Sequence, residues 1–143
     1  MSQSRLDGQL AIVTGASRGI GFAIAERFLK EGARVIMVSR RQESLNAVAE
    51  SLNTEHLGRA IPCALHVGHL PDIAPWFEQV VGQYGVPQIL VNNAGTNPHF
   101  GPFVDVEWPA WEKTFDVNLK GPFELARQVA KRLMRDELPG SII

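Results

Sequence analysis

The sequence contains a single cysteine, Cys63, among 143 residues, which excludes an intramolecular disulfide bond. It also lacks any apolar run close to the roughly 18 residues that a membrane-spanning helix needs. Neither charge sign is in excess, since 14 Lys and Arg residues stand against 15 Asp and Glu residues. A surface that binds nucleic acid or anionic lipid would carry a basic excess. We therefore expect one cytoplasmic domain with one core and with neither nucleic acid nor membrane as a partner.

A glycine-rich turn joins an expected strand to an expected helix near the N-terminus. Residues 10–14 form a short apolar run that is typical of a buried strand. Apolar residues then recur at the spacing of one helix face, at Ile20, Ala23, Ile24 and Phe28. Between them lie Gly15, Gly19 and Gly21, which permit a tight turn and a close backbone approach. The free N–H groups of such a helix favour an anion, and the pyrophosphate of a dinucleotide is the obvious candidate.

The spacing of these glycines separates the turn from two other phosphate-binding loops. A Walker-type loop closes with Lys-Ser or Lys-Thr, and no such pair follows here. The common dinucleotide fingerprint is Gly-x-Gly-x-x-Gly, whereas three residues separate Gly15 from Gly19 in this chain. A purely structural corner between strand and helix is the alternative for the turn taken by itself.

The second expected strand, residues 34–39, ends without an acidic residue. An NAD site would carry a carboxylate here to bind the ribose 2′-hydroxyl, but the chain has Ser39-Arg40-Arg41. A guanidinium group offers a planar fork of donors that suits a phosphate, and Arg18 in the glycine turn could reach the same phosphate. The alternative is that Arg40 and Arg41 only solvate a surface turn. The place at the carboxyl end of a strand favours NADP(H) as the cofactor.

Two histidines lie at and just after the end of the third expected strand, residues 60–67. Pro62 within this strand predicts an edge position in the sheet, and Cys63 is expected to be buried as a small apolar residue. His66 and His69 are three residues apart, which raises a metal site as an alternative. We expect no metal and place His66 beside the adenine of the cofactor.

The fourth expected strand, residues 88–91, runs into Asn92-Asn93-Ala94-Gly95. The small Ala94 and Gly95 leave room for a ribose against the strand end, and the Asn amides can tie neighbouring loops to the sheet. The loop at residues 96–109 follows, and its aromatic side chains either line a substrate pocket or pack the loop down.

A long helix is expected to begin near Pro109. Its predicted inward face consists of Trp111, Phe115, Leu119, Phe123, Ala126, Ala130 and Leu133. Pro122 has no N–H group, so it should bend the helix between Asn118 and Pro122 and leave the Asn118 carbonyl free. We expect this carbonyl to face the crevice near Asn93, Ala94 and Gly95.

Three segments together resemble the short-chain dehydrogenase/reductase family of classical type. They are Thr14–Gly21, Asn92–Gly95 and Asp116–Gly121, and the last resembles the family's catalytic-asparagine segment at Asn118. The resemblance covers essentially all 143 residues. It implies an α/β fold, a Rossmann-type doubly wound parallel sheet, which here is truncated at the start of the fifth strand.

The resemblance also implies what residues 1–143 would lack. They would form an incomplete dinucleotide-binding domain, because the catalytic Ser and the Tyr-x-x-x-Lys pair belong to the later part of the family's chain. The only tyrosine, Tyr84, has Gln88 and not lysine four residues on. By itself the chain is therefore expected to be inactive.

The implied function is an NADP(H)-dependent oxidoreductase that transfers hydride between nicotinamide and an alcohol or carbonyl substrate, as a homo-oligomer when complete. Residues 97–101 look like a carbonyl-reductase branch. A non-catalytic NADP-binding or interaction module is the alternative. In the family an acidic residue often stands at the place of His66 and contacts the adenine amino group, where a neutral imidazole could accept one hydrogen bond.

The expected site therefore has one catalytic candidate, Asn118, and no metal ligand. The expected cofactor-binding residues are Gly15, Ser17, Arg18, Gly19, Ile20, Gly21, Ser39, Arg40, His66, Val67, Asn93, Ala94 and Gly95.

Overall fold

Strands and helices alternate along the chain in the computed structural model, which describes residues 4–143. The strands are β1 (Leu10–Thr14), β2 (Arg34–Val38), β3 (Ala60–Pro62), β4 (Ile89–Val91) and β5 (Ser141–Ile142). The helices are α1 (Gly19–Lys30), α2 (Gln42–His56), α3 (Leu70–Tyr84), α4 (Trp108–Phe115) and α5 (Gly121–Arg135). A 3₁₀ turn, η1 (Phe103–Asp105), precedes α4, and a π turn, η2 (Asp116–Lys120), joins α4 to α5.

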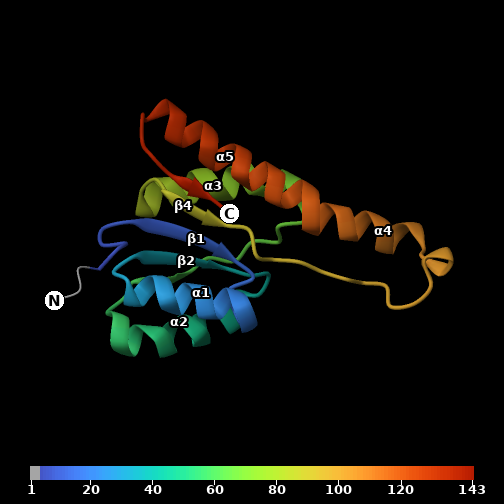
Figure 1. Cartoon of the computed structure of the whole chain (residues 1–143), viewed down its shortest axis with the longest axis horizontal. Coiled ribbons are helices and arrows are strands. Elements are labelled where there is room, and N and C mark those ends of the chain that lie inside the picture. Colours follow the sequence, from blue (N-terminus) through green and yellow to red (C-terminus); the bar gives the residue numbers. More distant parts are fainter. Residues whose placement is uncertain (1–3) are drawn as a thin grey trace.

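The five strands form one parallel sheet in the order β3-β2-β1-β4-β5 (Figure 1). The chain moves outward from β1 in one direction and then returns to the other side of β1, which is the doubly wound arrangement. This confirms the predicted Rossmann-type sheet and its fifth strand. It also confirms the edge position that Pro62 predicts for β3, where the missing N–H of proline costs no ladder bond.

Alternate residues of the central strands face two separate cores. Ala11 and Val13 point toward the layer of α1 and α2, whereas Ile12 and Ile36 point toward the layer of α3 and α5. Figure 1 shows these two helix pairs on opposite faces of the sheet. All four side chains are fully buried. A parallel sheet covered on both faces explains why its central strands are continuous apolar runs.

The predicted inward face of the long helix is correct at Leu133 and Ala126 and wrong over its first half. Phe115, Leu119 and Phe123 are exposed at 37%, 58% and 65%. The buried face consists of Val117, Gly121, Leu125, Val129 and Leu133. Gly121 explains which face packs inward, because a Cβ at this position would overlap the backbone carbonyl of Val67. The helix therefore packs inward with the face on which Gly121 allows the closest approach, and the bulkier apolar residues point outward.

A π turn interrupts this helix at the place where Pro122 predicts an irregularity. The N–H of Gly121 donates to the carbonyl of Asp116, five residues earlier, and Pro122 follows with no N–H to offer. The Lys120 ammonium also contacts the Asp116 carboxylate at 2.7 Å. The direction of the Asn118 carbonyl stays a prediction.

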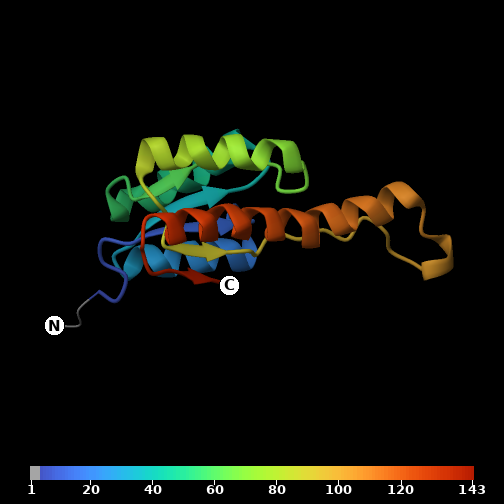
Figure 2. The ribbon, with the colours of Figure 1, turned by 90° about the horizontal axis from the view of Figure 1, so that it is seen from above.

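The loop after β4 and the start of α4 extend beyond the end of the sheet (Figures 1 and 2). Phe100, Phe103 and Trp108 on this extension are exposed at 95%, 85% and 74%. Trp111 packs against Phe115 with ring centroids 4.7 Å apart, still on the outer side. Within residues 4–143 these aromatic side chains are exposed, so the expectation that they pack the loop down is wrong, whereas a role in a substrate pocket stays a prediction.

Candidate cofactor-binding site

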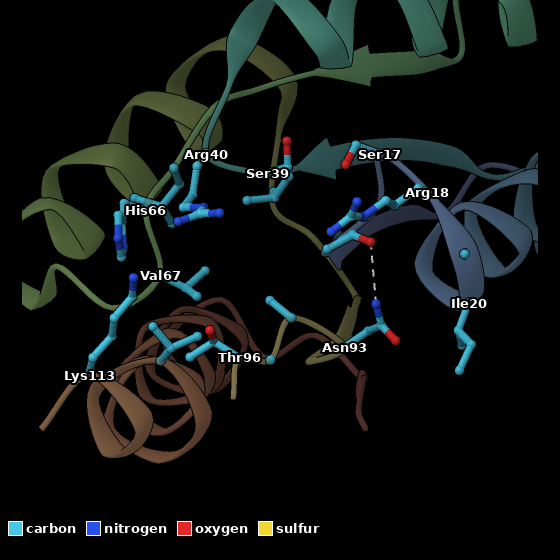
Figure 3. A pocket seen from close by; sticks show the side chains of 17 residues that line it. Ser17, Arg18, Ile20, Ser39, Arg40, His66, Val67, Asn93, Thr96 and Lys113 are labelled. Atoms are coloured by element: carbon cyan, nitrogen blue, oxygen red, sulfur yellow. Dashed lines mark hydrogen bonds between the residues drawn. The ribbon is translucent and has the colours of Figure 1, made fainter. Parts of the chain in front are cut away.

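The carboxyl ends of β1, β2 and β4 open into a cavity of about 460 Å³ (Figure 3). It lies where the strand order reverses around β1, which is the place where open α/β sheets hold their ligands. Of the predicted residues, the cavity is lined by Gly15, Ser17, Arg18, Gly19, Ile20, Ser39, Arg40, His66, Val67, Asn93, Ala94 and Gly95. Gly21 and Asn118 lie outside the lining and act on it through their neighbours.

The glycine turn presents the N-terminus of α1 to this cavity. Arg18 is extended just before the helix, and no side chain caps the helix at this point. The first N–H groups of α1 therefore have no partner within the helix and favour an anion. Gly15 has a φ of +64°, a left-handed conformation that other residues adopt only with strain.

Gly21 allows the close packing on which the turn depends. The space that a side chain at Gly21 would need is already occupied, because a Cβ there would overlap the carbonyl of Gly15 and lie 2.6 Å from Nδ2 of Asn93. The glycine turn and the loop after β4 are thus pressed together, and both line the same cavity.

Thr14 and Asn93 tie the ends of β1 and β4 together. The Oγ1 of Thr14, whose residue is only 2% exposed, accepts the backbone N–H groups of Asn93 at 3.0 Å and Ala94 at 2.9 Å. In return the Asn93 amide donates to the Thr14 carbonyl at 3.1 Å. The amide thus does what its sequence position predicts, and Thr14 is a positioning residue that the sequence reading missed.

The end of β2 contributes a hydroxyl and a guanidinium group. Ser39 and Arg40 line the cavity, and Figure 3 shows Arg18 and Arg40 on either side of Ser39. Within residues 4–143, neither arginine pairs with a carboxylate. Arg41 is different, because it precedes α2 and does not line the cavity. The pocket therefore holds two unpaired positive charges beside the helix N-terminus.

Asn118 holds the loop that follows Gly95. Its Oδ1 accepts the N–H of Thr96 at 2.7 Å, and its Nδ2 donates to the carbonyl of Thr96 at 2.8 Å. Both side-chain groups are therefore used, and Thr96 lines the cavity. Asn118 is exposed, and so is Phe115, which was predicted to lie on the inward face. The side chain of Asn118 therefore positions the Thr96 backbone at the edge of the cavity.

The family model for short chain dehydrogenases matches residues 9–143. The chain belongs to this family. A relative from Caenorhabditis elegans, "Dehydrogenase/reductase SDR family member 4", is 37% identical over 132 residues, which cover 92% of this chain and 51% of the relative. The Homo sapiens protein of the same name is 36% identical over 128 residues, which cover 90% of this chain and 46% of that protein. The chain thus spans about half the length of the curated relatives it matches.

Solved structures of the family share the fold closely. L-Sorbose reductase from Gluconobacter frateurii, complexed with NADPH and L-sorbose, has a TM-score of 0.89 and 32% identity, and covers 99% of this chain and 53% of its own. A metagenomic short-chain oxidoreductase in complex with NADP has a TM-score of 0.89 and 38% identity. The match covers 96% of this chain and 61% of the oxidoreductase. The matches identify the chain as part of an oxidoreductase family whose members bind NADP or NADPH in these two structures.

The only tyrosine of this family member lies away from the cavity. The carbonyl of Tyr84 accepts a hydrogen bond from Arg34 at 3.1 Å, which places Tyr84 at the amino end of β2. Burial and the neighbouring Cys63 raise the pKa of Tyr84, and burial also raises the pKa of the Cys63 thiol. Cys63 is half-buried just after β3, a little more exposed than predicted. Tyr84 therefore has no part in the site.

Lys113 of α4 lines the cavity, although its sequence position gave no signal. It lies on α4 four residues before Val117 of η2, which lines the same cavity. Within residues 4–143, no three His, Cys, Asp or Glu side chains lie close enough to share a metal ion. In the same part of the chain, no helix has the length and apolar character to span a membrane.

Proposed function

We propose that this chain is the cofactor-binding part of an NADP(H)-dependent oxidoreductase that interconverts an alcohol and a carbonyl compound. One observation carries the cofactor preference: Arg18, Ser39 and Arg40 line one cavity with the glycine turn. A carboxylate at the end of β2, which would favour NAD, is absent from the lining. The NADP and NADPH complexes of two family structures support the same preference.

The side chains present fit such a cofactor. The free N–H groups of α1 would hold the pyrophosphate, and the Arg18 and Arg40 guanidinium groups would hold the 2′-phosphate. The space kept open at Ala94 and Gly95 would take a ribose. When bound, the nicotinamide supplies or accepts the hydride. Asn118 acts on this site as a positioning residue, because it fixes the Thr96 backbone at the edge of the cavity.

The acid/base group of the reaction would lie in a part of the protein beyond these residues. Tyr84 is the only tyrosine in the chain, and Gln88 stands four residues later. We therefore infer that residues 1–143 bind the cofactor without completing the reaction. We also propose a cytoplasmic location, which a chain with a single free cysteine fits. The substrate would be a small carbonyl compound or alcohol.

Titration of nicotinamide fluorescence with NADPH and NADH tests the cofactor preference. Charge-assisted contacts to a phosphate are worth roughly 1.5–3 kcal/mol, so NADPH should bind at least about tenfold more tightly than NADH. Arg40→Asp should abolish or reverse this preference. Arg41→Asp is the matched control, because Arg41 does not line the cavity and its loss should leave the preference unchanged. Equal affinities for the two cofactors would refute the proposal.

A non-catalytic NADP-binding module is the second candidate, favoured by the absence of Tyr84, the only tyrosine of the chain, from the lining of the cavity. The two candidates differ in one assay on the full-length protein. Loss of nicotinamide absorbance with a panel of small ketones and aldehydes supports the enzyme. NADPH binding without turnover, together with a chain that carries no later tyrosine-lysine pair, supports the module.

We further propose that the complete protein is a homo-oligomer. Leu119 and Phe123 are exposed on the outer face of η2 and α5, and Met134 near the end of α5 is 79% exposed. A row of large apolar side chains on a helix is typical of a contact surface rather than of a free surface.

A further inference from the structure

The adenosine end of the cavity carries two cationic hydrogen-bond donors and no carboxylate. If the cofactor lies as proposed above, with its pyrophosphate at α1, this end is formed by Arg40, His66, Val67, Lys113 and Val117. Figure 3 shows Arg40, His66, Val67 and Lys113 together on the side of the cavity away from Ile20. The two charged groups, a guanidinium and an ammonium, can only donate. The one ambiguous group is the imidazole of His66.

A hydrogen bond within the turn after β3 settles which nitrogen of His66 carries the proton. The backbone N–H of Gly68 donates to Nδ1 of His66 at 3.1 Å. Nδ1 is therefore the acceptor, and in the neutral ring the proton lies on Nε2. His66 lines the cavity and, in this form, carries a donor at Nε2, which differs from the acceptor that the sequence led us to expect.

The turn that makes this bond is held in place by close packing. A Cβ at Gly68 would lie 2.6 Å from Cγ2 of Val117 and 3.0 Å from Cε1 of His66. The N–H of His69 also donates to the carbonyl of His66 at 2.9 Å. Gly68 thus lies close between Val117 of η2 and the ring of His66, where a side chain would have no room.

The carboxylates near this end lie outside the lining of the cavity. The carboxylate of Asp72 contacts Nδ1 of His69 at 2.8 Å, and the carboxylate of Asp116 contacts Lys120 at 2.7 Å. Both lie in the adjoining groove with Glu112, outside the lining of the cavity. The backbone carbonyl of Ser39 accepts the N–H of Leu65 at 2.9 Å. A base at this end therefore meets donors from the side chains.

We propose that His66 removes the usual selection for the 6-amino group of the cofactor's purine. A carboxylate at this position would accept a hydrogen bond from the 6-amino group and repel a 6-oxo group. The Nε2–H of His66 instead donates to a ring nitrogen of adenine, or equally to the 6-oxygen of hypoxanthine. The site should therefore accept the 6-oxo form of the dinucleotide about as well as NADP(H). The inference rests on the proposed function.

Calorimetric titration with NADP⁺ and with nicotinamide hypoxanthine dinucleotide phosphate tests this directly. The unsubstituted protein should bind the two within about threefold of each other. His66→Asp should favour NADP⁺ by about tenfold or more, because the 6-oxo analogue would leave the carboxylate facing an acceptor. His69→Asn is the matched control, since His69 lies in the adjoining groove and not in the cavity. Its ratio of dissociation constants should equal that of the unsubstituted protein.

Three outcomes overturn the inference. The first is a preference of tenfold or more for NADP⁺ in the unsubstituted protein, which decides the matter even where His66→Asp fails to fold. The second is a ratio that His66→Asp leaves unchanged. The third is binding of neither dinucleotide, which refutes the proposed function as well, whereas the first two leave NADP(H) binding intact.

Discussion

Replacing Thr14 by valine removes a single hydroxyl from the junction of β1 and β4. Valine keeps the shape of threonine, so the change leaves no cavity. What it removes is the acceptor of two backbone N–H groups, those of Asn93 at 3.0 Å and Ala94 at 2.9 Å. Thr14 is 2% exposed, so water cannot take the place of the hydroxyl.

The expected loss of stability follows from the two unpaired donors. A buried donor left without a partner costs about 1–3 kcal/mol. Asn93 and Ala94 are half-buried, which places each in the lower part of that range. We therefore expect Thr14→Val to lower the free energy of unfolding by about 2–4 kcal/mol. Typical domains are stable by about 5–15 kcal/mol, so this is a large share.

Urea unfolding followed by circular dichroism measures the effect as a shift in midpoint at constant slope. Thr14→Ser is the control, because it keeps the hydroxyl and loses only a methyl group, worth about 1 kcal/mol. The reasoning fails if Thr14→Val unfolds within about 0.5 kcal/mol of the unsubstituted protein. It also fails if Thr14→Ser is as unstable as Thr14→Val.

Three further changes have expected outcomes. Gly21→Ala should abolish NADPH binding in a fluorescence titration, because the turn has no room for a Cβ, whereas Gly82→Ala, in open space on α3, should not. Hydrogen bonds from Arg5 lower the pKa of Glu31 from 4.5 to about 2. The stability gained from this ionised group is present above pH 4.5 and is lost as the pH falls toward 2, so Glu31→Gln should flatten acid unfolding in that window. Residues 1–143 alone should self-associate at micromolar concentration in sedimentation, and Phe123→Lys should weaken the association.

The sheet and the glycine turn could be predicted because their signals are local. Apolar runs such as residues 10–14 mark buried strands, and the turn that follows allows only glycine where φ is positive or the backbone packs closely. Gly21 shows this most plainly, since a Cβ there would overlap the carbonyl of Gly15 within the same turn. Such features need no knowledge of distant contacts.

The faces of the long helix could not be predicted, because the sequence is apolar on two sides of it. Periodicity identifies an apolar stripe but not which stripe meets the sheet. The structure selects the stripe with Gly121, which lets the helix approach Val67, and leaves Leu119 and Phe123 outside. The π turn also shifts the register between α4 and α5, so a regular helical spacing cannot describe both.

The proton position on His66 was equally hidden from the sequence. It depends on the direction of one backbone N–H, that of Gly68, in a turn whose shape is set by contact with Val117. Likewise, that Lys113 of α4 lines the cavity is visible only in the structure. Properties that arise from contacts between distant segments require the structure.

A crystal structure of the protein with bound NADP⁺ tests the cofactor assignment most directly. We predict that the 2′-phosphate contacts the guanidinium groups of Arg18 and Arg40, with the pyrophosphate at the N-terminus of α1. A dinucleotide whose 2′-phosphate lies in solvent, away from both arginines, would contradict the assignment of this site to NADP(H).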